Sequence, residues 1–280
     1  MIRPVPTIRC LAPAKINLFL SVGRPDARGY HPLRTIFQAV GLFDVVTVAE
    51  ARSETSVTFD VPGIPDINTV SRAIDLYKER FELPPLSVHV SKSIPSQAGL
   101  GGGSSDAATV LRILQRISGD ALSETELARL ALQIGADVPF FLVGGVAKAE
   151  GYGEVLTPLD DEPRRWLVLA RPDEGCPTGP MFEKLDSLDY AWKAFPEDHH
   201  PYNDFERVAP CACIDLIERL QVHGAGRAGL SGSGSAVFGV FEDEARARHA
   251  IVGLKSEGVP WVEVAPTLSR EESLNGYVLS

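Results

Sequence analysis

A glycine-rich segment between a predicted strand and a predicted helix constrains this chain more than any other feature. It reads Ile94-Pro95-Ser96-Gln97-Ala98-Gly99-Leu100-Gly101-Gly102-Gly103-Ser104-Ser105-Asp106. Glycines let a backbone approach an anion closely and turn several N–H groups toward it, and a helix start adds its partial positive charge. The segment therefore predicts a phosphate-binding loop, in which Ser104 and Ser105 cap the helix or bind phosphate and Mg²⁺.

Two better-known nucleotide-binding loops do not match this segment. A P-loop requires Lys and then Ser or Thr after its last glycine, whereas Ser104 follows Gly103 directly. The dinucleotide-binding fingerprint requires Gly or Ala three residues after Gly101, and Ser104 occupies that position. The alternative interpretation is a flexible loop or tight turn that serves only the backbone.

Composition excludes several classes of partner. The 280 residues include 27 Lys and Arg against 37 Asp and Glu, and the net charge of -10 disfavours nucleic acid and anionic membranes as partners. We expect neither a signal peptide nor a membrane span, because no long apolar run is present. The cysteines lack the spacing of a structural zinc site, so we expect free thiols in the cytoplasm, at Cys10, Cys176, Cys211 and Cys213.

Apolar spacing predicts an α+β fold in two parts. Helices are expected over 70–81 and 110–117, and a third begins at Ser123, which forms a capping box with Glu126, and ends at Gly135. A domain boundary is expected near residue 157, which gives domains 1–157 and 158–280. Strands are expected over 15–22, 45–49, 56–60, 86–91, 166–170, 236–241 and 261–265, with a polar, proline-rich stretch over 171–201.

Lys15 and Asp137 each stand alone as a charge in an otherwise apolar run. A charge in such surroundings is costly unless it is paired. One interpretation is a buried ion pair with no catalytic part. The other is phosphoryl transfer, in which Asp137 orients and deprotonates an acceptor hydroxyl while Lys15 stabilises charge on the phosphoryl group.

With these segments identified, the chain resembles the GHMP kinase superfamily over nearly its whole length. Its motifs 13–18, 99–108 and 230–238 are similar to the three ordered signatures of that superfamily. Arg28-Gly29-Tyr30-His31-Pro32-Leu33 and Gly135-Ala136-Asp137-Val138-Pro139-Phe140-Phe141 further resemble the family that phosphorylates the 2-hydroxyl of 4-diphosphocytidyl-2-C-methyl-D-erythritol, in non-mevalonate isoprenoid biosynthesis. The rivals are another small-molecule GHMP kinase, for homoserine, mevalonate or a sugar, and a catalytically silent binding protein on the same fold.

The resemblance implies roles for individual residues. Lys15 and Asp137 are implied to be the catalytic pair, with ATP and Mg²⁺ as cofactors and unidentified metal ligands. The ATP site is implied to include Asn68, Pro95, Ser96, Gln97, Ala98, Gly99, Leu100, Gly101, Gly102, Gly103, Ser104 and Ser105. The substrate site is implied to include Asn17, Tyr30, His31, Phe182, Ser231, Gly232 and Ser233.

The resemblance also assigns parts of the substrate, and alternatives remain for each. Tyr30 and Phe182 are implied to stack on cytosine while His31 bonds its edge, although all three could instead be ordinary loop or core residues. Asn68 and the Asn203-Asp204-Phe205-Glu206 segment match family elements, with helix capping as the alternative. The chain departs from the family pattern at Ser96-Gln97, which puts the affinity for nucleotide in doubt.

The implied fold has a ribosomal-protein-S5-like N-terminal domain, with a left-handed βαβ crossover, and a ferredoxin-like C-terminal domain. ATP and a small cytidyl substrate are implied to bind between the two domains, with neither nucleic acid nor membrane as a partner.

Overall fold

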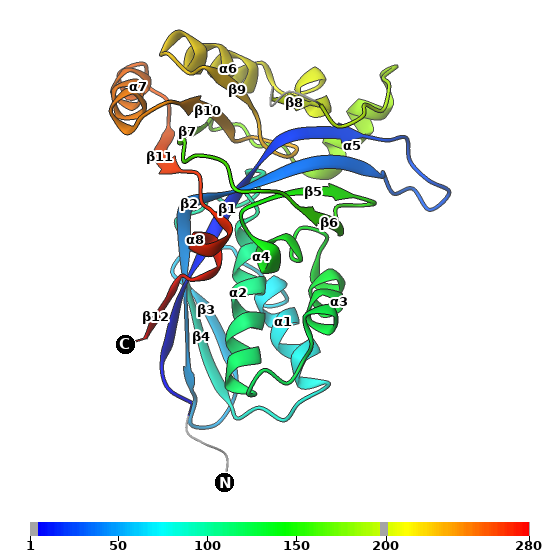
Figure 1. Cartoon of the computed structure of the whole chain (residues 1–280), viewed down its shortest axis with the longest axis vertical. Helices are drawn as coiled ribbons and strands as arrows, with labels where there is room; N and C mark the ends of the chain where they lie inside the picture. Colours follow the sequence, from blue (N-terminus) through cyan, green and yellow to red (C-terminus); the bar gives the residue numbers. More distant parts are fainter. Residues whose placement is uncertain (1–4, 197–200, 280) are drawn as a thin grey trace.

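The computed structural model describes residues 5–196 and 201–279, and its described strands form two sheets (Figure 1). The larger sheet has eight strands in the order β12-β1-β2-β4-β3, with β5 and β8 pairing to β2 and β1 and β6 pairing to β5. Its members are β1 (Ile8–Val22), β2 (Leu33–Glu50), β3 (Ser56–Phe59), β4 (Leu86–Ser91), β5 (Val146–Glu150), β6 (Val155–Pro158), β8 (Tyr202–Asn203) and β12 (Tyr277–Leu279).

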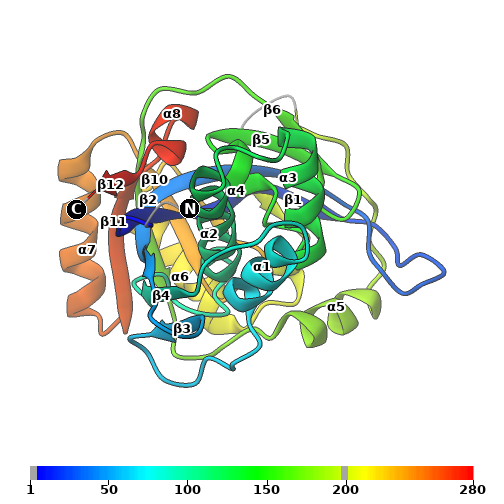
Figure 2. The ribbon, with the colours of Figure 1, turned by 90° about the horizontal axis from the view of Figure 1, so that it is seen from below.

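Helices α1, α2 and α3 cover one face of the larger sheet (Figure 2). The apolar stripe of α2 includes Val110, Leu111 and Leu114, all fully buried, and each such side chain contributes about 1.5–3 kcal/mol by leaving water. The helices on this side of the chain are α1 (Thr69–Lys78), α2 (Gly102–Ile117), α3 (Glu124–Ile134) and α4 (Phe140–Val143).

The smaller sheet has four strands in the order β11-β7-β10-β9, and each neighbouring pair is antiparallel. With a helix after the first strand and before the last, this is the ferredoxin-like arrangement, and that prediction is confirmed. Its strands are β7 (Trp166–Arg171), β9 (Arg227–Leu230), β10 (Val237–Phe241) and β11 (Trp261–Pro266). The helices of this half are α5 (Thr178–Asp186), the 3₁₀ turn η1 (Asp204–Arg207), α6 (Cys211–Val222) and α7 (Glu244–Ser256). Helix α8 (Arg270–Leu274) packs against α4 and β2 of the larger-sheet half.

The elements predicted from local signals agree with this arrangement. All seven expected strands and three expected helices are present, and α3 has its capping box at Ser123 and Glu126 and ends before Gly135. Helix α1 stops at Lys78 rather than at residue 81, while α2 begins inside the glycine-rich segment. The proline-rich stretch 171–201, for which no helix was predicted, contains α5.

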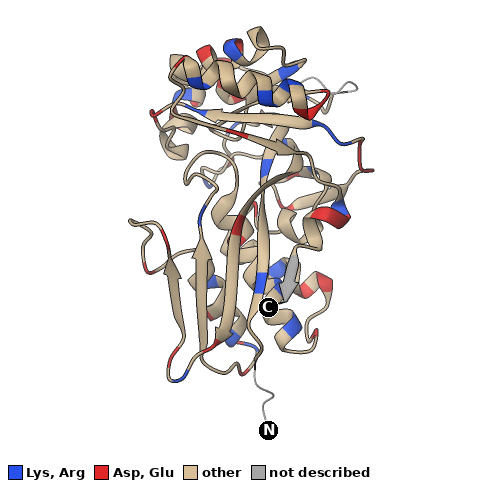
Figure 3. Ribbon diagram, turned by 90° about the vertical axis from the view of Figure 1, so that its left-hand side faces the viewer, with Lys and Arg blue, Asp and Glu red and all other residues tan. Residues whose placement is uncertain are grey.

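The chain crosses from one sheet to the other between β6 and β7, beside the boundary that we predict near residue 157. It returns twice, because β8 pairs in parallel with Phe19 and Leu20, and β12 pairs with the start of β1. In the part of the chain that the structure describes, no helix is both long and apolar enough to cross a membrane. Charges of both signs intermingle on the outer helices (Figure 3).

Candidate active site

Strand β1 places Lys15 and Asn17 on one face, because alternate residues of a strand point the same way. Lys15 Nζ donates to Asn17 Oδ1 at 2.7 Å, and Asn17 Nδ2 donates to Thr35 Oγ1 on β2, also at 2.7 Å. The Thr35 hydroxyl donates in turn to the carbonyl of Phe19 at 2.6 Å. This chain of bonds fixes the ammonium of Lys15. Thr35 was absent from the predicted site, because only the pairing of β1 with β2 brings it there.

The Asp137 carboxylate approaches the same ammonium from the turn that follows α3. Its Oδ2 lies 3.5 Å from Lys15 Nζ, so the predicted pairing of the two charges is present. The two side chains differ in accessibility: that of Lys15 is 4% exposed and that of Asp137 is 35% exposed. A carboxylate that only balanced a buried lysine would not need this access to solvent. The pair is therefore placed so that a ligand can reach the acid.

The glycine-rich segment turns directly into α2. Its N-cap is Gly101, at φ 73°, and no side chain caps the helix, so the capping role considered for Ser104 and Ser105 is wrong. Ser105 Oγ is buried and has no hydrogen-bond partner among the described residues. The first-turn amides of α2 therefore stay available to an anion, as they are at other helix N-termini.

A second loop, 231–235, lies against the glycine-rich segment. Ser231 Oγ donates to the carbonyl of Gly99 at 2.9 Å, and the amide of Ala236 donates to the carbonyl of Ala98 at 3.0 Å. The amide of Gly232 donates to Asn17 Oδ1 at 2.9 Å. Segments more than a hundred residues apart in sequence thus meet around Lys15.

We expect Gly99→Ala to lower kcat/KM for ATP by about tenfold or more, because misplacement of a positioned group by about 1 Å can cost that much. A Cβ on Gly99, at φ 76°, would lie 2.0 Å from the carbonyl oxygen of Ser231, so the two loops would separate. Gly119→Ala is the control, since Gly119 has φ 73° but nothing within 4 Å of its Cβ position. Steady-state kinetics on both variants measures the effect. Equal losses would show that backbone strain, not loop contact, is responsible.

Two cavities meet at the glycine-rich segment. One, of about 530 Å³, is lined by Lys15, Asn17 and Asp137. The other, of about 470 Å³, lies over the start of α2. Both are lined by Gln97, Gly99 and Gly101. The second cavity also contains Asn68, Pro95, Ser96, Ala98, Gly102, Gly103 and Ser104, so it gathers most of the predicted ATP-binding residues. Leu100, behind them, is buried in the core.

The predicted cytosine-binding residues are only partly brought together. Phe182 lines the cavity of Lys15 and Asp137, as do Gly232 and Ser233, whereas Tyr30 and His31 do not. His31 stacks on Phe182 with ring centroids 4.6 Å apart, and Tyr30 is 63% exposed. Tyr152 also lines this cavity and meets Tyr30 edge to face at 5.9 Å. Sequence reasoning missed Tyr152, which lies in a loop with no signature of its own.

Asn68 and Asn203, for which helix capping was the alternative interpretation, do cap helices. Asn68 Oδ1 accepts from the amides of Val70 and Ser71 at the start of α1. Asn203 caps η1 in the same way, and its Nδ2 also donates to the carbonyl of Gly232 at 2.8 Å. Capping and a place beside the site are thus compatible.

Gln97, where the chain departs from the family pattern, has φ 53°, a left-handed conformation that is costly for a non-glycine residue.

A buried ionic cluster joins the two ends of the glycine-rich segment. Lys92 Nζ donates to Asp106 Oδ2 at 2.6 Å and to Asp44 Oδ2. Asp44 Oδ1 accepts from the amides of Ser93 and Ile94, where the segment begins. Asp44 is at the middle of β2 and Asp106 is in α2, so the cluster ties strand, loop and helix together. Its members were not predicted as site residues, although Asp106 belongs to the glycine-rich motif.

Burial raises the pKa of Asp106 from 3.8 to about 7, although the charge of Lys92 opposes the shift. The folded protein then binds more protons at Asp106 than the unfolded chain does between these two values. We therefore expect the free energy of unfolding of the wild type, relative to Asp106→Asn, to fall as the pH rises from about 4 to about 7. Urea unfolding of both proteins at several pH values measures this difference. A constant difference would contradict the raised pKa.

Comparisons with known proteins bear on both halves of the chain. Residues 68–145 match the family model for the GHMP kinases N terminal domain, and residues 213–259 match that for the GHMP kinases C terminal. A protein from Geobacter metallireducens named 4-diphosphocytidyl-2-C-methyl-D-erythritol kinase is 39% identical over 276 residues, which are 91% of this chain and 96% of that protein. One of the same name from Anaeromyxobacter is 38% identical, covering 90% of this chain and 88% of its own.

Solved structures agree in fold. A crystal structure of 4-(cytidine 5'-diphospho)-2C-methyl-D-erythritol kinase superposes with a TM-score of 0.80 at 33% identity, covering 92% of this chain and 98% of the other. Homoserine kinase from Cytophaga hutchinsonii shares the fold alone, with a TM-score of 0.70 at 17% identity over 94% and 95% of the two chains. The two-domain fold expected from the sequence is thereby confirmed.

Proposed function

The chain belongs to the 4-diphosphocytidyl-2-C-methyl-D-erythritol kinase family of GHMP kinases, and on that premise we propose how its residues move a phosphoryl group from ATP to the 2-hydroxyl of this cytidyl substrate. One observation carries the proposal. The Lys15–Asp137 pair, 3.5 Å apart, opens into a cavity that shares Gln97, Gly99 and Gly101 with the cavity over α2. A donor in one cavity and an acceptor in the other would meet at the pair.

The Asp137 carboxylate is the general base in this proposal. Its 35% exposure lets an acceptor hydroxyl reach Oδ2, and the rigid end of α3 holds the carboxylate in place. The loose transition state of phosphoryl transfer needs little early proton removal, so positioning supplies most of the rate. The proton of the hydroxyl passes to Asp137 as the new P–O bond forms and the bond to ADP breaks.

The Lys15 ammonium stabilises charge on the transferring phosphoryl group. Its Nζ is held by Asn17 and lies 5.2 Å from the ring centroid of Phe37, so it cannot follow the acceptor out of the cavity. Because the side chain of Lys15 is only 4% exposed, its fixed positive charge acts more strongly than it would in solvent. Asn17 thereby positions Lys15 and lies near the acceptor hydroxyl.

The glycine-rich segment is proposed to hold the ATP phosphates. The support is the uncapped first turn of α2, the left-handed Gly99 and Gly101, and the cavity of about 470 Å³ above them. The helix dipole favours the negative charge there. Among residues 5–196 and 201–279, no group of three or more His, Cys, Asp or Glu side chains could hold a metal ion.

This donor set fits Mg²⁺ that enters with ATP. Mg²⁺ keeps several waters and takes one or two protein ligands besides substrate phosphates, so it needs no cage of carboxylates. We propose the Ser104 hydroxyl as the protein ligand that would hold it, since Ser104 lines the cavity over the start of α2. The ion, when bound, offsets the charge that develops on the phosphates.

The cytosine ring is proposed to lie against Phe182, which lines the acceptor cavity. His31 supports this position, since it stacks on Phe182 while its Nε2 lies 3.3 Å from Asp186 Oδ2. Tyr30 would close over the other face of the base, moving from its exposed position beside Tyr152. Gly232 and Ser233, which line the same cavity, would contact the remainder of the substrate, while Ser231 holds their loop against Gly99. The enzyme would act in the cytoplasm.

A coupled ADP-release assay with Mg-ATP tests the proposal. The acceptors are 4-diphosphocytidyl-2-C-methyl-D-erythritol, homoserine, mevalonate and galactose. Turnover with the cytidyl substrate alone is the expected result. Turnover with another acceptor would support the kinase mechanism but contradict the proposed binding of cytosine against Phe182. Absence of turnover with all four acceptors would contradict the proposed function.

A further inference from the structure

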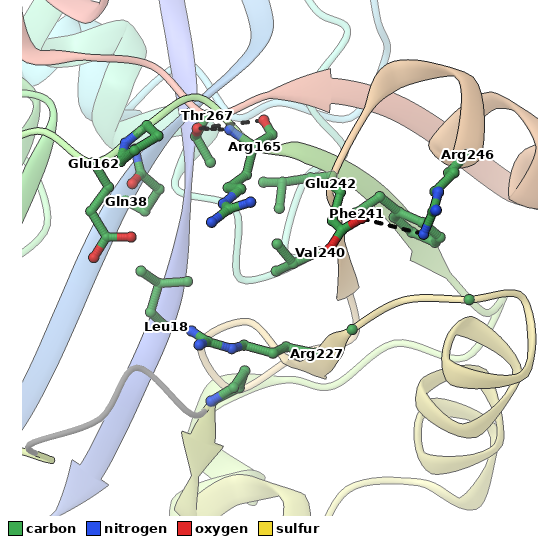
Figure 4. Close-up of a pocket in the computed structure, with 15 residues that line it drawn as sticks. Leu18, Gln38, Glu162, Arg165, Arg227, Val240, Phe241, Glu242, Arg246 and Thr267 are labelled. Atoms are coloured by element: carbon green, nitrogen blue, oxygen red, sulfur yellow. Dashed lines mark hydrogen bonds and ion pairs between the residues drawn. The ribbon is translucent and has the colours of Figure 1, made fainter.

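A separate cavity of about 470 Å³ lies between the two sheets, away from the kinase site (Figure 4). Leu18 on β1 and Gln38 on β2 line it, whereas their neighbours Asn17 and Phe37 line the acceptor cavity. Successive residues of a strand point to opposite faces. The two long strands therefore form a wall with the kinase site on one side and this second cavity on the other, and none of the described residues lines both cavities.

The side chain of Arg165 enters this cavity from just before β7. Its backbone is fixed to Thr267, with the amide donating to Thr267 Oγ1 and the carbonyl accepting from the Thr267 amide, both at 2.9 Å. Its guanidinium has no hydrogen-bond or ion-pair partner within residues 5–196 and 201–279. Figure 4 shows it reaching toward the space beside Leu18, into which Arg227, at the start of β9, extends from the opposite side.

The charge in the cavity differs from that of the whole protein. Among the residues that the structure describes, three arginines and two glutamates line it, which leaves one positive charge there in a chain whose net charge is -10. Arg246 and Glu242 form an ion pair at 3.4 Å, so they largely balance each other. Glu162 lies beside Gln38 (Figure 4). The guanidinium of Arg165 is thus directed at the space a ligand would fill, and Arg227 faces it across that space.

Apart from Gln38 and Thr267, the uncharged side chains of the described lining are apolar, and they include Leu18, Leu167 and Val240. Guanidinium forks match the oxygens of a phosphate, and cavities of this volume with apolar walls and a few convergent polar groups are typical of small-molecule sites. We propose that this cavity is a second ligand site for an organic phosphate. Its head binds between Arg165 and Arg227, and its apolar body packs on Leu18, Leu167 and Val240.

Isothermal titration calorimetry of the full chain with hexyl phosphate, inorganic phosphate and 1-hexanol tests this site. Inorganic phosphate represents the charged head of the ligand alone, and 1-hexanol represents its apolar body alone. We expect hexyl phosphate to bind with a dissociation constant at least about tenfold below that of either fragment. Arg165→Met, which keeps the alkyl stem, weakens hexyl phosphate by about tenfold, and so does Arg227→Met. Arg164→Met is the matched control, because Arg164 is an exposed neighbour that pairs with Glu272 and does not line the cavity.

Lys15→Met distinguishes the second site from the kinase site, and the expected result is unchanged binding of hexyl phosphate. Loss of binding in Lys15→Met but not in Arg165→Met would place the phosphate at the glycine-rich segment and overturn the proposal. Absence of binding, or equal losses in the Arg164 and Arg165 variants, would also overturn it. None of these binding measurements depends on turnover. An inactive protein with this binding pattern would therefore contradict the proposed function but would still support the second site.

Discussion

Asn in place of Asp137 is expected to lower kcat by about 10²- to 10⁴-fold, the usual contribution of a positioned general base. The amide keeps the shape of the side chain but cannot accept the proton of the acceptor hydroxyl. Nucleotide binding should persist, because the glycine-rich segment and α2 do not depend on Asp137 for their hydrogen bonds. The measurements are kcat with the cytidyl substrate and the dissociation constant of ADP by calorimetry.

Two comparisons make the Asp137 result specific. Asp160→Asn changes an exposed aspartate outside both kinase cavities, and we expect normal kcat from it. Asp137→Asn should still unfold as a cooperatively folded protein, because the buried Lys15 ammonium keeps its hydrogen bond to Asn17 Oδ1. Near-normal turnover by a folded Asp137→Asn variant would remove the base from the mechanism and leave the Lys15–Asp137 contact as a structural ion pair.

Lys92→Met is expected to cost about 3–5 kcal/mol of unfolding free energy, the range for removing one partner from a buried ion pair. The side chain of Lys92 is only 6% exposed, and its loss leaves the buried Asp44 carboxylate without a cation. Loss of the Lys92 bridge between Asp44 and Asp106 should also loosen the two ends of the glycine-rich segment. Urea unfolding gives the first effect, and KM for ATP gives the second.

The triple variant Lys92→Met, Asp44→Asn, Asp106→Asn separates charge from packing. It removes all three charges, while the amide oxygen of the new side chain at position 44 can still accept from the amides of Ser93 and Ile94. Replacing a whole buried ionic cluster by neutral groups is often close to neutral in stability, so we expect most of the lost free energy to return. If Lys92→Met unfolds at the wild-type urea concentration, the cluster does not support the loop.

Local signals predicted the elements that depend on neighbours in sequence. The capping box of Ser123 and Glu126 together with Gly135 defined α3, and the position of Asp137 just after that helix followed from it. The glycine-rich segment and its helix were predicted for the same reason, since glycine permits the left-handed conformations seen at Gly99 and Gly101.

Contacts that depend on how strands distant in sequence pair with each other could not be predicted from the sequence. The bond from Asn17 to Thr35 depends on the register of β1 against β2, which includes irregularities after Pro13 and after Asn17. Such shifts leave no periodic trace in a single strand, and each changes which residues face each other. The Lys92 cluster was missed for the same reason, whereas Tyr152 was missed because its loop has no signature of its own. Helix α5 was missed because its nine residues bury only Met181 and Leu185 on one face.

The two returns of the chain to the larger sheet affect how the protein is made. Strand β12, the last described element, pairs with residues 8–10 at the start of β1, and β8 pairs with its end. During synthesis the N-terminal half therefore waits with an uncovered strand edge until residues 277–279 have left the ribosome. An unpaired edge is prone to associate with other chains. Nascent chains that stop after residue 158 should consequently depend on chaperones, and the completed chain should not.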